Sequence, residues 1–222
     1  MTMKKLNVNT NGNKKLQNTD NVRFMIWNLP AVKTCPFRTQ MCEQSCYARK
    51  AERVYPQVLP SREKNFNDSL EKDFSENMVY TIETLLNSRA YKGKTVYFRI
   101  HESGDFYNEE YAKKWVEIAR HFSEDNRIVF EAYTKSLAFI IAAGYGTPIW
   151  PNNFIIRASV WNDTKKDSLE LIDSYNFPIY TAFPAQDFEK LAQGYTECKC
   201  EDCATCGKCY KRDDHKIAVK IH

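Results

Sequence analysis

The chain has 222 residues, of which 43% are hydrophobic, and this length and composition suffice for one domain with a substantial core. Its net charge of +4 falls well short of the concentrated charge of a dedicated nucleic-acid binder. No apolar run reaches the length of a membrane span and the first residues do not resemble a signal peptide, so we expect a soluble, cytoplasmic protein.

The chain opens with a polar segment that precedes the first predicted strand. Residues 1–21 are rich in Lys, Asn and Thr, which predicts an extended N-terminal arm. The apolar run at 22–29 predicts a buried strand that ends at Pro30. Three cysteines follow in the loop after this strand: Cys35, Cys42 and Cys46.

Strand and helix patterns then alternate along the chain. Further strands are predicted at 95–100, 127–133, 153–160, 178–183 and 217–221. Helical spacing is found at 74–87, from Tyr111 to Phe122, at 136–144 and at 166–175. This alternation predicts an α/β domain at 22–190 with about six parallel strands, as an open sheet or a partial (β/α) barrel.

Polar side chains follow several of these strands, at the edge where parallel α/β folds gather their sites. His101 could act as an acid–base group or a ligand, or be a hydrogen-bonded structural histidine. Asp105 could serve catalysis or a cofactor, or cap the next helix. Lys135 and Arg157 could bind phosphate, carboxylate or ribose groups of a cofactor, the alternative being solvated charge.

A second group of cysteines lies near the C-terminus, in a segment at 191–222 that we expect to pack on the barrel. Its members are Cys198, Cys200, Cys203, Cys206 and Cys209. Four of them recur at every third position, which is typical of iron–sulfur loops, while paired C-x2-C units serve zinc equally well. An intracellular chain keeps its thiols reduced, so metal ligation is favoured over disulfides.

The cysteine count allows two arrangements of metal centres. In the first, the three upstream cysteines form an open site and four tail cysteines a closed one, with Cys198 spare. In the second, the tail donates one thiolate to the upstream site, which gives two closed centres of four cysteines each. An open site indicates catalysis, whereas two closed sites indicate electron transfer or structure.

Short motifs along nearly the whole chain resemble a family of phage and mobile-element proteins that has a gene-product number and no assigned activity. They are N-G-N-K-K-L at 11–16, C-P at 35–36, C-Y-A at 46–48, H-E-S-G-D-F at 101–106, T-K-S at 134–136 and the C-terminal cysteines.

The cysteine loop after the first strand, the Gly-Asp turn after the second and Thr-Lys after the third also resemble radical S-adenosylmethionine (SAM) proteins. That resemblance implies a partial, TIM-barrel-like fold with a [4Fe–4S] cluster on Cys35, Cys42 and Cys46. It further implies that Ser103, Gly104 and Asp105 lie near the methionine part of S-adenosylmethionine, and that the tail holds an auxiliary cluster. The spacing here is C-x6-C-x3-C, where the superfamily has C-x3-C-x2-C.

The sequence therefore favours an iron–sulfur protein that is a radical SAM-like enzyme, with a substrate that the sequence does not identify and that could be nucleic acid or a nucleotide. The first alternative is a zinc-binding module for nucleic acid or protein. The second is a noncatalytic iron–sulfur electron carrier.

Overall fold

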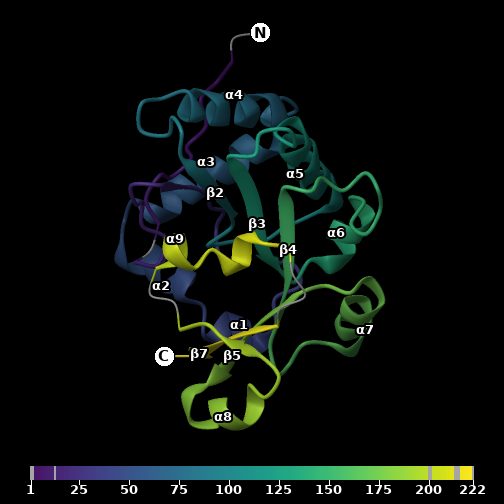
Figure 1. Cartoon of the computed structure of the whole chain (residues 1–222). Coiled ribbons are helices and arrows are strands. Elements are labelled where there is room, and N and C mark those ends of the chain that lie inside the picture. Colours follow the sequence, from purple (N-terminus) through teal and green to yellow (C-terminus); the bar gives the residue numbers. More distant parts are fainter. Residues whose placement is uncertain (1–2, 13, 200–201, 213–215, 222) are drawn as a thin grey trace.

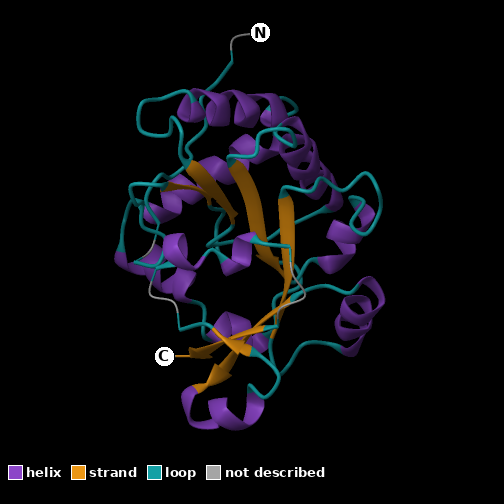
Figure 2. Ribbon diagram, viewed as in Figure 1, coloured by secondary structure: helices purple, strands orange, loops and turns teal. Residues whose placement is uncertain are grey.

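The computed structural model describes residues 3–12, 14–199, 202–212 and 216–221, whose strands form a curled half-barrel with helices on its outer side (Figures 1 and 2). Every pair of neighbouring strands is parallel, in the order β1-β2-β3-β4-β5-β7-β6. The bounds are β1 Val22–Trp27, β2 Thr95–Ile100, β3 Ile128–Thr134, β4 Phe154–Val160, β5 Ile179–Pro184, β6 Thr196–Glu197 and β7 Ile217–Ile221.

The predicted α/β half-barrel is confirmed, but the sheet has seven strands rather than about six. The additional strand is β6, whose two residues are too few to produce a hydrophobic period. The strand predicted at 217–221 is present as β7, and it lies between β5 and β6.

The four helices expected from periodicity are present, while the helices within 40–70, at 188–191 and at 203–206 were not predicted. The bounds are α1 Gln40–Gln44, α2 Tyr47–Val54, α3 Val58–Leu70, α4 Phe74–Leu86, α5 Glu109–His121, α6 Leu137–Ala142, α7 Lys166–Tyr175, α8 Phe188–Leu191 and α9 Cys203–Cys206. Pro60 lies in the first turn of α3, where a missing N–H costs nothing.

The main core lies between the outer face of the sheet and the helices. Alternate strand residues such as Trp27, Phe98 and Phe130 point outward and are fully buried. Trp115 of α5 packs against Phe74 and Phe98 at centroid distances of 5.8 and 5.4 Å. Burial of these large apolar side chains is the main stabilising contribution to the fold.

A smaller cluster lies on the inner, concave face. Phe24 and Ile26 of β1 contact Leu16 from the N-terminal segment and Tyr210 from the tail. Tyr210 stacks on Tyr97 at 4.0 Å, and Figure 1 shows the tail crossing this face in front of β3 and β4. The N-terminal segment and the tail thus both reach the inside of the half-barrel.

The N-terminal segment also covers the free edge of β1. Leu6 is buried in the main core, and Asn9 forms an antiparallel bridge with Ile26. Such cover hides backbone groups that an edge strand would otherwise expose. Among the described residues, no helix combines the length and apolar character needed to cross a membrane. The domain boundaries at residues 21 and 190 stay a prediction.

Candidate metal and ligand site

The upstream cysteines sit at the carboxyl end of β1, in a loop that is tied to its neighbours. Cys35 precedes α1, Cys42 lies within it, and Cys46 caps α2. The Met41 N–H donates to Asp163 after β4 (2.8 Å), and the Tyr47 hydroxyl donates to the Glu102 carbonyl after β2 (2.6 Å). These bonds hold the loop over the open end of the half-barrel.

Gly104 allows this loop and the exit of β2 to approach closely. Its φ is +86°, and a Cβ at this position would lie 2.6 Å from Leu29 Cβ and 2.7 Å from Thr34 Oγ1. Ser103 donates its hydroxyl hydrogen to the Leu29 carbonyl (2.9 Å). Ser103 and Gly104 thus join the loop that carries the cysteines to β2.

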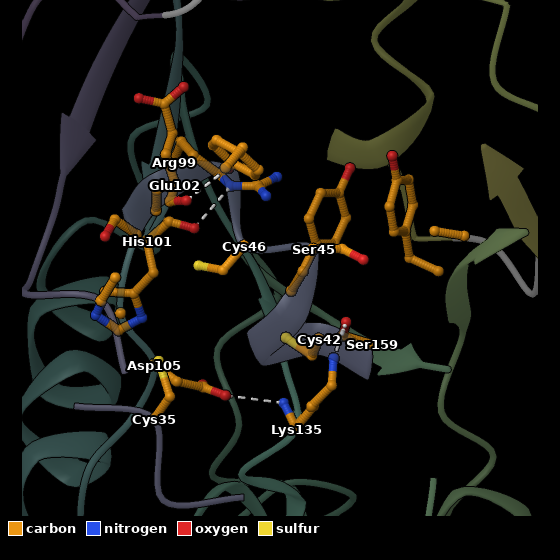
Figure 3. A pocket seen from close by; sticks show the side chains of 18 of the residues that line it. Cys35, Cys42, Ser45, Cys46, Arg99, His101, Glu102, Asp105, Lys135 and Ser159 are labelled. Carbon is orange, nitrogen blue, oxygen red and sulfur yellow. Dashed lines mark hydrogen bonds between the residues drawn. The ribbon is translucent and has the colours of Figure 1, made fainter. Parts of the chain in front are cut away.

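A cavity of about 620 Å³ opens at this end of the half-barrel, and cysteines from both groups line it. Figure 3 shows the three upstream cysteines at this cavity. The upstream group contributes all three of its members and the tail contributes Cys198, Cys203 and Cys209. Cys206 does not line the cavity, and the predicted ligand Cys200 lies outside the described residues. Residues about 150 positions apart in sequence therefore face one chamber.

The tail is fixed to the inner face by buried polar contacts. Arg157 of β4 is fully buried, and its Nη2 donates to the carbonyls of Lys208 (3.1 Å) and Lys211 (3.2 Å), on either side of Cys209. The Cys203 N–H donates to the Lys15 carbonyl (2.8 Å). Arg157 was predicted as a cofactor-binding residue, but it does not line the cavity and it positions the tail instead.

His101 is buried beside the cavity in a strained backbone conformation, with φ at +68°. Its Nε2 is 2.9 Å from the Tyr111 hydroxyl, which also accepts the Trp27 indole N–H (3.0 Å). Burial, with a smaller effect of Arg99, lowers the pKa of His101 to about 3. The imidazole is therefore neutral at physiological pH, which suits a hydrogen-bonding group better than a proton carrier.

The carboxylate of Asp105 holds two strand exits together. It accepts hydrogen bonds from the Thr134 hydroxyl (2.5 Å) and from the N–H groups of Lys135 (3.0 Å) and Phe106 (2.8 Å). Burial raises its pKa, although these hydrogen bonds oppose the rise. The alternative that Asp105 caps the next helix is wrong, because Asn108 is the N-cap of α5.

Lys135 brings a positive charge close to the upstream cysteines. Its Nζ donates to Ser159 (2.7 Å) and lies 5.7 Å from the Trp161 ring. Burial lowers the pKa of Lys135, while neighbouring Cys42 has the opposite effect. Figure 3 shows this side chain rising toward Cys42 and Ser159. It is placed to offset negative charge on the cysteine sulfurs or on a ligand.

Sequence reasoning missed the residues on the cavity wall that belong to the strands themselves. Arg99, Tyr133 and Tyr180 all line the cavity. A signal for Arg99 was present, because the two-residue period of a strand places it on the face opposite the apolar Phe98 and Ile100. Tyrosine is a common β-former in buried strands, so its residue type gave no such signal.

The cysteines that line the cavity carry the type of donor atom that soft metals bind. Burial raises the pKa of Cys35 and of Cys209 to about 12 and that of Cys203 to about 11, so these thiols are protonated unless a metal binds them. Sulfur ligands select iron–sulfur clusters or zinc. Within the described ranges, no three His, Cys, Asp or Glu side chains form a group that could hold a single metal ion.

Comparison with known proteins gives the chain a family. The family model described as Gene product 88 matches residues 2–217. The "Gene 88 protein" of Mycobacterium phage D29 is 30% identical over 105 residues, which cover 46% of this chain and 42% of the phage protein. The match thus spans less than half of that relative's length, and no solved structure matches significantly. Because the family model covers nearly its whole length, the chain belongs to the Gene product 88 family.

Proposed function

We propose that this protein binds iron–sulfur clusters and is an enzyme similar to the radical S-adenosylmethionine proteins. The observation that carries the proposal is the placement of two cysteine groups, from distant parts of the chain, around one cavity at the carboxyl end of a parallel half-barrel. Sites in parallel α/β folds lie at this end.

In this proposal, Cys35, Cys42 and Cys46, which all line the cavity, would hold a [4Fe–4S] cluster. The longer C-x6-C spacing contains a turn and the start of α1, and it brings Cys42 into the cavity lining beside Cys35. Thiolates of such a cluster bind different irons, so they lie farther apart than the ligands of a single ion. When reduced, the cluster supplies the electron that cleaves S-adenosylmethionine in this superfamily.

The surrounding residues bind and orient the ligand in this scheme. Ser103, Gly104 and Asp105 form the wall after β2, beside the cluster loop. The Lys135 ammonium offsets the negative charge of the cluster ligands or of a carboxylate. The half-barrel wall keeps water away from reactive groups. His101 keeps the wall in place through its contact with the Tyr111 hydroxyl.

The tail cysteines form the second centre of the proposal. Cys198, Cys203 and Cys209 face the cavity, so a cluster on them would lie opposite the first. Arg157 keeps Cys209 in position through the flanking carbonyls. Nucleic acid or a nucleotide is the candidate class of substrate.

Metal analysis of anaerobically purified protein tests the proposal. We expect a brown protein with iron and sulfide near about eight each per chain. The triple variant Cys35→Ala, Cys42→Ala and Cys46→Ala should lose about half of the iron and keep its circular dichroism spectrum. Colourless protein with about two zinc ions would refute radical chemistry and favour a zinc-bound interaction module, to be tested by salt-dependent nucleic-acid binding.

A further inference from the structure

The charge of the cavity wall points to an anionic ligand. Five basic residues line the cavity, against two carboxylates: Lys14, Lys15, Arg38, Arg99 and Lys135 against Glu102 and Asp105. The Asp105 carboxylate already accepts three hydrogen bonds from its own loop and from the exit of β3. Positive charge that lines a cleft favours a ligand of opposite charge.

Arg99 is the most rigidly held of these cations. Its side chain is 11% exposed, and its guanidinium lies 3.6 Å from the centre of the Tyr133 ring. Tyr180 stacks on Tyr133 at 4.2 Å, so the arginine has a fixed aromatic platform. A guanidinium that is ordered before binding loses little entropy when it binds an anion.

Two of the three Arg99 nitrogens have partners inside the protein. Nη1 pairs with Glu131 Oε2 at 2.5 Å, and Nε donates to the His101 carbonyl at 3.3 Å. In the described part of the chain, Nη2 makes no hydrogen bond. Figure 3 shows the guanidinium extending toward the middle of the cavity, which Arg99 lines.

We propose that the Nη2 group of Arg99 anchors an oxyanion, a carboxylate or a phosphate, of the ligand that occupies the cavity between the two cysteine groups. Glu131 and Tyr133 fix the plane of the guanidinium, and the residual N–H groups supply the charge-assisted hydrogen bonds. Lys135 lines the same chamber and adds to its positive charge. The inference goes beyond the proposed function and does not require that an iron–sulfur cluster be present.

Anion binding at Arg99 can be measured by the stabilisation that the anion gives to the full chain. Melting temperature is followed during titration with inorganic phosphate and, separately, with acetate, at constant ionic strength set by chloride. The variant Arg99→Lys keeps the charge and loses the planar fork. The control Arg127→Lys makes the same change at an arginine paired with Asp125 at the opposite end of β3. Metal content is measured on the same samples.

We expect saturable stabilisation of the wild type and of Arg127→Lys, and a dissociation constant about tenfold higher for Arg99→Lys. If phosphate but not acetate stabilises the protein saturably, the anionic group of the natural ligand is a phosphate ester. If acetate stabilises it saturably, that group is a carboxylate. The inference is overturned if neither anion stabilises saturably, or if Arg99→Lys binds as well as the wild type. If Arg99→Lys does not fold, Tyr133→Leu tests the platform and should weaken binding about threefold. If protein purified anaerobically contains no metal but binds the anion, the iron–sulfur proposal fails and this inference stands.

Discussion

The outer and inner faces of the half-barrel take alternate residues from the same strands and bury different chemistry. The outer face buries residues such as Phe98 and Phe130 beneath helices α4 to α6. The inner face holds Arg99, Glu131 and Arg157, of which Arg99 lines the cavity and pairs with Glu131 while Arg157 binds the tail. Buried charges contribute little net stability. We infer that the outer face stabilises the fold and that the inner face positions the site.

The largest expected effect is on the outer face. Trp115→Ala removes a fully buried ring from between Phe74 and Phe98 and should lower the free energy of unfolding by about 3–5 kcal/mol. Urea denaturation measures the loss. Metal bound per folded chain should not change, and a parallel fall in metal content would contradict the separation of the two faces.

On the inner face, Arg157→Leu removes the donor to the Lys208 and Lys211 carbonyls. It also removes one of the two arginine charges, those of Arg99 and Arg157, that favour the ionised Glu131 carboxylate. Burial raises the pKa of Glu131, whereas Arg99 and then Arg157 lower it. We expect a loss of about 3 kcal/mol in urea denaturation, because charged hydrogen bonds to buried carbonyls disappear. Unlike Trp115→Ala, this variant should lose the metal bound by the tail cysteines. Unchanged metal content would show that Arg157 is not needed to position the tail.

The same contrast explains how far the sequence could predict the molecule. Periodicity located most elements, because strands and helices that bury an apolar face carry a regular pattern. It missed α1 and α2, whose short polar segments bury little more than Ala48. The cysteines and the β2 exit were predictable from residue type and order. The role of Arg157 in holding the tail was not predictable, because the chain segment that it binds lies about 50 residues away in sequence.

Acidification provides a smaller test on His101, whose pKa is lowered to about 3 in the folded state from an ordinary value of 6.5. Between these values the unfolded chain binds a proton that the folded chain does not, so this contribution is present above pH 6.5 and is lost as pH falls. At about pH 5 we expect a loss of about 2 kcal/mol relative to neutral pH. His101→Asn tolerates the positive φ and should lack this loss in paired urea titrations. Equal losses in both proteins would contradict a neutral, buried imidazole.

The smallest expected effect compares two glycines with similar backbone conformations. Gly93 has φ +70° and open space where a Cβ would lie, whereas Gly104 has φ +86° and a Cβ there would meet Leu29 and Thr34 within 3 Å. Each substitution by alanine should cost about 1 kcal/mol for the left-handed conformation. Gly104→Ala should cost about 1 kcal/mol more, since it forces the cysteine loop away from the exit of β2. Urea denaturation of both variants measures this difference. Weaker metal retention in Gly104→Ala alone would place the extra strain at the cavity, whereas identical behaviour of the two variants would show that the loop yields without affecting the inner face.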